Sequence, residues 1–306
     1  MFGYILKRLL QMIPTLIGVS ILSFILIHAV PGDPARMMAG QQASEKDVEM
    51  MRDRLGLNQP LYQQYGNYVA HLVQGDLGKS IRSNRPVMEE IKTRFPITIK
   101  LTVFAVLLMI VFGLFAGIFS ATKPNSLADN STMMISLFGI SMPVFWLGIM
   151  LILIFSYYLH WLPSGGNDGI KYFILPAVTL GLSSSAILAR LTRSSMLEVT
   201  NQDFVRTARA KGVKEQMVVY KHTLANAAIP IVTVIGLEFG HLLGGAVLTE
   251  TVFSMNGLGR FIIQSIQFRD YPAIQGCVLF VATLFVLVNL IVDLSYGLLD
   301  PRVKYE

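Results

Sequence analysis

The sequence predicts an all-α polytopic membrane protein with six transmembrane helices. Of the 306 residues, 53% are hydrophobic and only 14% are charged, whereas a soluble globular domain carries about 25% charged residues. Six apolar stretches reach the roughly 20 residues that a helix needs to cross a bilayer core. Basic residues also gather in the connectors that alternate membrane crossings place on one side. These three observations exclude an ordinary soluble domain.

The predicted spans follow one another along the whole chain. In order, they are Leu9–Val30, Ile99–Ala121, Thr132–Leu159, Tyr172–Ala189, Ala225–Leu248 and Ala273–Leu298. The first is longer than the roughly 7–15 residues of a signal-peptide core and lacks a small-residue cleavage pattern, so we expect an uncleaved span. Pro143 predicts a kink in the third span. The fourth is the weakest, because Pro176 and Gly181 interrupt it.

Charge asymmetry predicts that both termini are cytoplasmic. With the N-terminus inside, the inner segments hold Lys7, Arg8, Lys123, a cluster from Arg190 to Lys221, Arg302 and Lys304. The short outer loops hold only Lys171, Arg260 and Arg269. This distribution follows the positive-inside rule. It also accounts for the net charge of +6, so we expect no nucleic-acid partner. The single cysteine, Cys277, excludes an intrachain disulfide.

The long first connector, Pro31–Pro96, predicts a small helical external domain. Ser44 followed by Asp47 resembles a helix N-cap, Pro60 suits a first helical turn, and Pro86 is expected to open a third short helix. The predicted organisation is therefore residues 1–30 (cytoplasmic N-terminus and helix 1), 31–96 (external domain), 97–298 (membrane core, with an inner loop at about 190–224) and 299–306 (cytoplasmic tail).

The most distinctive connector runs from Phe204 to Pro230. Its basic residues, set against the single acid Glu215, are Arg206, Arg209, Lys211, Lys214 and Lys221. Ala208 and Gly212 lie four apart, so on a helix they share one face without bulk, which another protein can approach closely. We predict that a cytoplasmic motor docks on this segment.

Short motifs distributed along the chain now support a family resemblance. They are PGDPAR at 31–36, LGLNQPLYQQY at 55–65, GDLGKS at 75–80, FVRTARAKG at 204–212, NAAIP at 226–230, ETVFSMNGLGR at 250–260, RDYP at 269–272 and DPRVKY at 300–305. In combination they resemble the inner-membrane permease subunits of ABC importers for dipeptides, oligopeptides, glutathione and nickel.

The resemblance implies a type I ABC importer permease fold and a division of labour. This chain is expected to be the first permease of a pair, in the cell (inner or plasma) membrane of a prokaryote. Its implied partners are a second homologous permease, two cytoplasmic ATPase subunits, an external substrate-binding protein and the lipid bilayer. Specificity is expected to lie largely in the binding protein. The implied cargo is a small peptide or glutathione, with a nickel or metal-chelate importer as the alternative.

The resemblance also assigns the coupling loop. The family pattern Glu-Ala-Ala-x-x-x-Gly aligns on Gly212, which places the second alanine at Ala208, the first at Thr207 and the glutamate at Arg206. The chain departs from the general pattern at the last two positions. The residues expected to couple to the ATPase are Phe204, Val205, Arg206, Ala208, Arg209, Lys211 and Gly212, with Phe204 and Val205 as apolar anchors.

No pattern in the sequence predicts an enzyme, a cofactor or a metal site. The phosphate-binding motif GxxxxGK[ST] is missing, so ATP hydrolysis is expected on separate subunits. The NGLGR segment is expected in an outer loop, where its glycines suit a tight re-entrant turn. The resemblance implies that Asn256, Gly257 and Gly259 act near an outer gate or contact the binding protein, and the alternative is an ordinary outer connector.

Polar residues inside the predicted spans leave alternatives open. Glu238 and His241 share one helix face, and a charged group at a helix centre costs roughly 2.5–3.5 kcal/mol on insertion scales, so both are expected to face the protein interior. They either line the pathway or form a packing pair. Asp293 is expected to snorkel or to form an ion pair. An ion-coupled secondary transporter would use Glu238, His241 and Asp293, but no inverted repeat supports that class.

Overall fold

The computed structural model describes residues 2–29, 33–39 and 42–299, and in these ranges the chain is helical without a strand. Turns and loops connect the helices, and within the described ranges an isolated bridge joins Lys79 and Pro86. The tail motif at 300–305, and part of the PGDPAR motif, lie outside the described residues. The chain divides into two compact units, which we describe separately.

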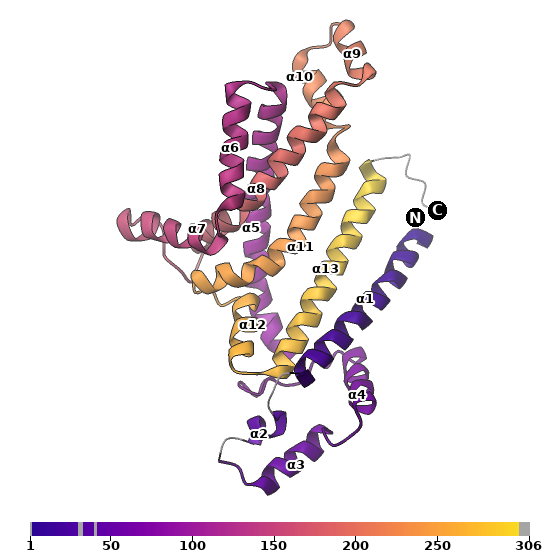
Figure 1. Ribbon diagram of the computed structural model, residues 1–306, viewed down its shortest axis with the longest axis vertical. Coiled ribbons are helices and arrows are strands. Elements are labelled where there is room, and N and C mark those ends of the chain that lie inside the picture. The colour runs from indigo at the N-terminus through magenta and orange to yellow at the C-terminus, as the bar shows by residue number, and fades with distance from the viewer. Residues whose placement is uncertain (1, 30–32, 40–41, 300–306) are drawn as a thin grey trace. The chain divides into compact units, whose positions relative to one another are not determined.

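The larger unit comprises residues 96–260 together with both chain ends. Its elements are most of α5 (Val87–Thr122), α6 (Leu127–Ser141), α7 (Val144–Leu151), the π-helix η1 (Ile152–Tyr158), α8 (Lys171–Thr200), α9 (Asp203–Ala210), α10 (Glu215–Met217), the π-helix η2 (Val218–Leu224), α11 (Ala228–Val252) and the second half of α13 (Tyr271–Leu299). Helix α8 is central, because it packs against α6, α7 and α11 (Figure 1). Its side chains Leu188 and Met196 are buried in the core.

Helices α5 and α8 approach closely because α5 presents two glycines four residues apart. A Cβ placed on Gly113 would lie 2.8 Å from Leu188 Cβ, and one on Gly117 would lie 2.5 Å from Thr192 Cβ and 2.7 Å from the Ala189 carbonyl oxygen. Small residues at this spacing let two membrane helices pack backbone against backbone. The GxxxG pair therefore fixes α5 against the helix that leads to the predicted coupling loop.

The described residues offer three helices long and apolar enough to cross a membrane, or up to five if each of two bent pairs is one span. The three are Val87–Thr122, Lys171–Thr200 and Tyr271–Leu294, and a shorter apolar helix covers Leu10–Ile25. The fourth predicted span is thus extended at its C-terminal end, and the count of six spans stays a prediction.

Pro143 breaks the third predicted span. The predicted kink is therefore confirmed, but the span is not one continuous helix. Helices α6 and α7 meet at an angle of 100°, and Met142 between them is extended, with φ −76° and ψ 128°. The residue before a proline is driven out of the helical region by the proline ring. The fifth predicted span is also bent, by 61°, between η2 and α11.

The smaller unit comprises residues 5–95 and 261–286. It holds most of α1 (Phe2–Ala29), α2 (Pro34–Ala39), α3 (Glu45–Leu55), α4 (Leu61–Val73), the start of α5, most of α12 (Leu258–Gln267) and the first half of α13. The N-cap at Ser44 is confirmed as a reciprocal capping box with Asp47. Pro60 immediately precedes α4.

The predicted third short helix from Pro86 to Arg94 is wrong as a separate element. The chain from Val87 onward is the first part of α5, a single helix of 36 residues that contains Pro96. A proline removes one backbone donor but does not stop a long helix whose flanking turns are well packed. Val87 and Ile91, in the turns before Pro96, are buried.

Candidate functional site

The predicted coupling segment forms a short helix, α9, on the connector between α8 and α10. Figure 1 shows α9 and α10 at the end of the larger unit, beyond the C-terminal end of α8. The helix ends in a Schellman arrangement, in which Val213 N–H donates to the Ala208 carbonyl (3.2 Å) and Gly212 N–H donates to the Arg209 carbonyl (2.9 Å). Gly212 adopts φ 74°, a left-handed conformation that glycine tolerates best.

The two faces of α9 have different environments, and this corrects part of the prediction. Val205 is 0% exposed and Ala208 is 8% exposed, and both face the chain's own interior. The side chains of this segment that are accessible to a partner include Phe204, which is 41% exposed, and the exposed Arg206 and Lys211. Val205 is consequently no free apolar anchor. The predicted bare face of Ala208 and Gly212 is not formed, because Ala208 is covered and Gly212 serves to end the helix.

Ion pairing fixes the turn after α9. Arg209 donates from Nη2 to Glu215 Oε1 (2.7 Å) and from Nε to Glu215 Oε2 (3.2 Å). A bidentate pair of this kind gives geometric specificity as well as attraction. Arg206 has only a 3.8 Å contact with Asp203, and its side chain is 70% exposed. Arg209 thus shapes the segment, while Arg206, Lys211 and Lys214 give it a positive surface.

The buried carboxylate of Asp129 joins α6 to α8 in the larger unit. Asp129 is 0% exposed and accepts two hydrogen bonds from Arg193, at 2.7 Å from Nε and 2.6 Å from Nη2. The Asn125 N–H (2.8 Å) and the Ser120 hydroxyl also donate to it. In the sequence, the region around Arg193 indicated only positive charge that sets topology. The pair was missed because nothing in the sequence indicates a contact across 64 residues.

A second buried carboxylate holds the predicted gate segment. Glu250 is 0% exposed, and it accepts from the Thr98 hydroxyl (2.5 Å) and from the Arg260 N–H (2.9 Å). The Thr98 hydroxyl oxygen in turn accepts from the Leu258 N–H (2.8 Å). Because these amides belong to the first turn of α12, the carboxylate caps that helix at its positive end.

The glycines of this segment allow neighbouring atoms to approach their backbone closely, and they do not form a tight turn. A Cβ on Gly257 would lie 2.2 Å from Glu250 Oε1, and one on Gly259 would lie 2.6 Å from Val247 Cα. Neither glycine has a positive φ, whereas Ser254 before them does. Gly257 and Gly259 are buried, and Asn256 is exposed. The expected re-entrant glycine turn is therefore corrected, and a gating role stays a prediction.

In the smaller unit, two of the sequence motifs meet. Asp270 of the RDYP motif is buried and accepts from the Ser80 hydroxyl (2.5 Å), the Ile81 N–H (3.0 Å) and the Arg82 N–H (3.4 Å). Ser80 closes the GDLGKS motif, which lies 190 residues earlier. The sequence offered both motifs for the resemblance but not their contact.

Among the described residues, no site is assembled around the polar residues of α11 or around those of α13. Glu238 is partly buried, and its Oε2 has no hydrogen-bond partner among the described residues. His241, one helical turn later, is exposed. Asn289 and Asp293 are partly buried in α13. Pathway lining and packing both stay predictions for Glu238 and His241.

Known proteins resemble this chain along its whole length. Residues 109–305 match the family described as "Binding-protein-dependent transport system inner membrane component", and residues 1–102 match the corresponding N-terminal family. The dipeptide transport system permease protein DppB of Alkalihalophilus pseudofirmus is 48% identical over 333 aligned residues, covering 100% of both chains. The glutathione transport system permease protein GsiC of Escherichia coli O6:H1 is also 48% identical, again over 100% of both chains.

Solved structures support the fold. The inward-facing MetNI methionine ABC transporter aligns with a TM-score of 0.58 over 70% of this chain and 97% of that one. An amino acid ABC transporter crystallised with histidines aligns with a TM-score of 0.51 over 71% of this chain. Sequence identity is 20% in both cases, so these two likenesses concern the fold alone.

Proposed function

Because the chain belongs to the family of binding-protein-dependent transport system inner membrane components, we propose that it forms half of the translocation pathway of an ATP-driven importer for short peptides. The observation that carries this proposal is the 48% identity, over the full length, to a dipeptide permease and equally to a glutathione permease. Both relatives are named for peptidic cargo with free charged groups, so a short peptide is the chemistry that they share. Their equal identity does not favour either cargo.

The proposed assembly places this chain beside a second, homologous permease in a prokaryotic cell membrane. Six spans cross the bilayer, with the shorter apolar helix at Leu10–Ile25 inside the first and each bent helix pair as one of the others. Both termini are cytoplasmic, and residues 31–96 are external. Two ATPase subunits supply the energy, and an external binding protein delivers the peptide.

Helix α9 is the proposed contact with the ATPase. Phe204 offers an exposed aromatic ring, and Arg206 and Lys211 offer positive charge beside it. Aromatic anchors contribute affinity at interfaces, whereas rim charges mainly set orientation and association rate. Since α9 packs against α8 and η2, closure of the ATPase pair moves α8 as a rigid body, which is the interface-rotation class of transition.

A gate and a pathway are also part of the proposal. The first turn of α12, held by Glu250, lies next to Asn256, Gly257 and Gly259 and is proposed to move with α11 when the pathway opens. Glu238 and His241 are proposed to contact the passing peptide.

Reconstitution tests the function directly. The chain, its partner permease and the ATPases are reconstituted in proteoliposomes, with ATP supplied on the side that carries the ATPases. The binding protein, loaded with radiolabelled dialanine, is supplied on the opposite side. The proposal expects uptake that requires both ATP and the binding protein. Uptake by this chain alone, driven by a pH gradient and abolished by Glu238→Gln, would instead establish the ion-coupled class.

A further inference from the structure

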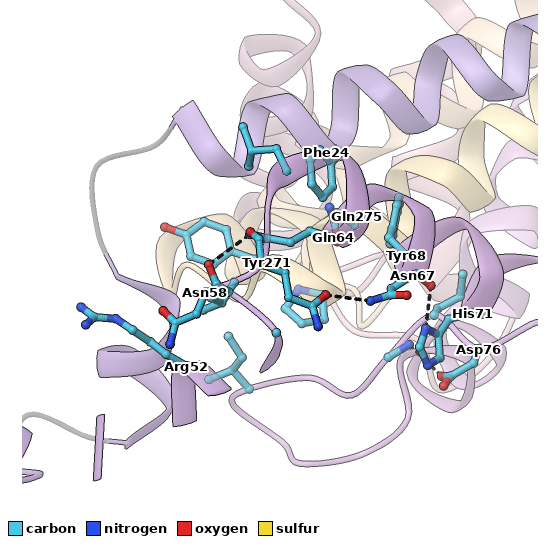
Figure 2. Close-up of a pocket in the computed structure, with 18 of the residues that line it drawn as sticks. Phe24, Arg52, Asn58, Gln64, Asn67, Tyr68, His71, Asp76, Tyr271 and Gln275 are labelled. Atoms are coloured by element: carbon cyan, nitrogen blue, oxygen red, sulfur yellow. Dashed lines mark hydrogen bonds between the residues drawn. The ribbon is translucent and has the colours of Figure 1, made fainter. Parts of the chain in front are cut away.

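The smaller unit contains a pocket that the proposed function leaves unused. Its volume is about 760 Å³, and it lies between α4, the loops on either side of α4 and the first turn of α13. Figure 2 shows the lining side chains converging on it. Pockets for small ligands span about 300–1,000 Å³, so this one has room for a ligand of two or three residues.

Side-chain amides line the middle of the pocket. Gln59, Asn67 and Gln275 contribute them, whereas the Asn58 amide nitrogen already donates to Glu49 (3.1 Å) and Asp53 (2.7 Å). The Asn67 amide donates to Gln59 Oε1 (3.1 Å), which leaves the Asn67 carbonyl and the Gln59 amide N–H groups for a ligand. Each peptide group carries one donor and one acceptor, and carboxamides offer both. The lining therefore matches a peptide backbone better than it matches a purely apolar or purely ionic ligand.

The two ends of the pocket differ in how their charged groups are paired. In Figure 2, Arg52 lies at one end and Asp76 at the other, beside His71. Arg52 donates to Asp33 (2.6 Å), which also lines the pocket, and to Glu49 (2.9 Å), so two carboxylates already balance its charge. The hydrogen bond to Asp33 raises the pKa of Arg52 further above its ordinary value, so its charge is permanent.

Asp76, at the other end of the pocket, is acidic and lacks such pairing. One of its carboxylate oxygens accepts from the Gly78 N–H (2.9 Å), and no cation pairs with it among the described residues. The side chain is exposed at the pocket wall. A carboxylate in this setting is suited to a ligand ammonium group, which supplies the missing positive charge.

A buried hydroxyl gives an independent indication of a ligand. Tyr271 lines the pocket and is 5% exposed, and its hydroxyl oxygen has no hydrogen-bond partner among the described residues. Buried polar groups in proteins are nearly always hydrogen-bonded, and an exception calls for a partner. Tyr68, which also lines the pocket, stays a neutral donor, because burial raises the pKa of its hydroxyl to about 12.

We propose that this pocket binds a short peptide, with the peptide's ammonium group at Asp76 and its peptide groups on the neighbouring side-chain amides. The choice of ligand rests on the proposed function, which it deepens. The permease itself then holds its cargo at a site separate from the one on the binding protein, and it discriminates against compounds that lack the ammonium group.

The test measures direct binding of radiolabelled dialanine to the assembled transporter in lipid nanodiscs, without binding protein. Wild-type transporter is expected to bind saturably. Asp76→Asn keeps an oxygen for the Gly78 N–H but removes the charge, and it is expected to weaken binding at least about tenfold. The matched control, Glu89→Gln, removes an exposed carboxylate outside the pocket and is expected to bind like wild type. Tyr271→Phe keeps the ring and is expected to weaken binding by about threefold or more.

An altered peptide locates the ammonium terminus. N-acetyl-dialanine is expected to bind weakly to wild type and to be indifferent to Asp76→Asn, because it lacks the ammonium group. Equal binding of dialanine to wild type and Asp76→Asn, equal binding of the acetylated peptide, or no saturable binding overturns the proposal. Loss of binding-protein association in Asp76→Asn with dialanine binding unchanged also overturns it, in favour of a docking surface for that protein.

Failure of this inference is separable from failure of the proposed function. If the wild-type transporter imports peptide with ATP and binding protein but does not bind dialanine alone, only the pocket assignment falls. If no peptide is imported at all, the proposed function falls.

Discussion

Arg193 and Asp129, 64 residues apart, form a bidentate ion pair with the carboxylate fully buried. The pair ties the start of α6 to the second half of α8, whose last residue lies three positions before α9. Two helices joined in this way move together. In the proposed coupling, force applied by the ATPase at α9 would therefore be passed to α6 as well as to α8.

Removing one partner of the clamp is expected to destabilise the chain. Arg193→Ala leaves the Asp129 carboxylate buried without its cation, which costs about 3 kcal/mol, the lower end of the range for broken buried pairs, since the Arg193 side chain is 25% exposed. Thermal unfolding of the purified transporter measures the loss. Arg206→Ala, at a side chain 70% exposed, is the control and is expected to leave the midpoint unchanged. A midpoint for Arg193→Ala equal to the control would contradict the clamp.

Asp270 is expected to protect the loop after the GDLGKS motif from hydrogen exchange. Asp270→Ala removes the acceptor for the Ile81 N–H (3.0 Å) and for the Ser80 hydroxyl, and a buried donor left unpaired costs about 1–3 kcal/mol. Hydrogen exchange at the Ile81 amide should accelerate by about tenfold or more. The Val218 amide in the larger unit, which bonds to the Lys214 carbonyl, should exchange as in wild type. Unchanged exchange at Ile81 would show that Asp270 does not hold the loop.

Gly257 is expected to be intolerant of a single methyl group. In Gly257→Ala the new Cβ would lie 2.2 Å from the Glu250 carboxylate, so the carboxylate must leave the N-terminus of α12 or the loop must shift. We expect a loss of about 1–3 kcal/mol, typical of overpacking, together with impaired uptake. Gly244→Ala is the matched control, because nothing lies within 4 Å of its added Cβ. Equal stability of the two variants would refute the close approach.

Phe204 is expected to carry much of the contact between α9 and the ATPase. Phe204→Ala should weaken assembly by about 2 kcal/mol, or roughly thirtyfold, as at other aromatic anchors, without lowering the amount of protein in the membrane. Co-purification of ATPase subunits and peptide-stimulated ATP hydrolysis both report the effect. Leu127→Ala removes another exposed apolar side chain, 86% exposed and outside α9, and should assemble normally. Normal assembly of Phe204→Ala would exclude this face as the docking site.

Hydropathy and short motifs predicted much of the helical architecture. The long apolar runs became α5, α8 and α13, because twenty or so apolar residues favour a helix wherever it is shielded from water. The proline rule predicted the break at Pro143. The same rule failed at Pro96, where packing of the flanking turns outweighs one lost backbone hydrogen bond.

The contacts that organise the site were beyond the reach of sequence patterns. Asp129 with Arg193 and Ser80 with Asp270 are contacts between distant segments, and polar residues of these types are common in solvated loops. Sequence spacing placed Ala208 and Gly212 on one face of a helix, but it could not show which face of α9 the chain covers. Val205 and Ala208 were therefore assigned to a partner, although they pack inside.

The sidedness of the α9 connector tests the account most directly. Lys214→Cys is introduced at an exposed position in a Cys277→Ser background, which lacks other cysteines, and Gln63→Cys on α4 serves as the external control. A membrane-impermeant maleimide applied to intact cells is predicted to label position 63 at once and position 214 only after permeabilisation. Labelling of position 214 in intact cells would place the connector outside the cytoplasm and contradict the proposed coupling to an ATPase.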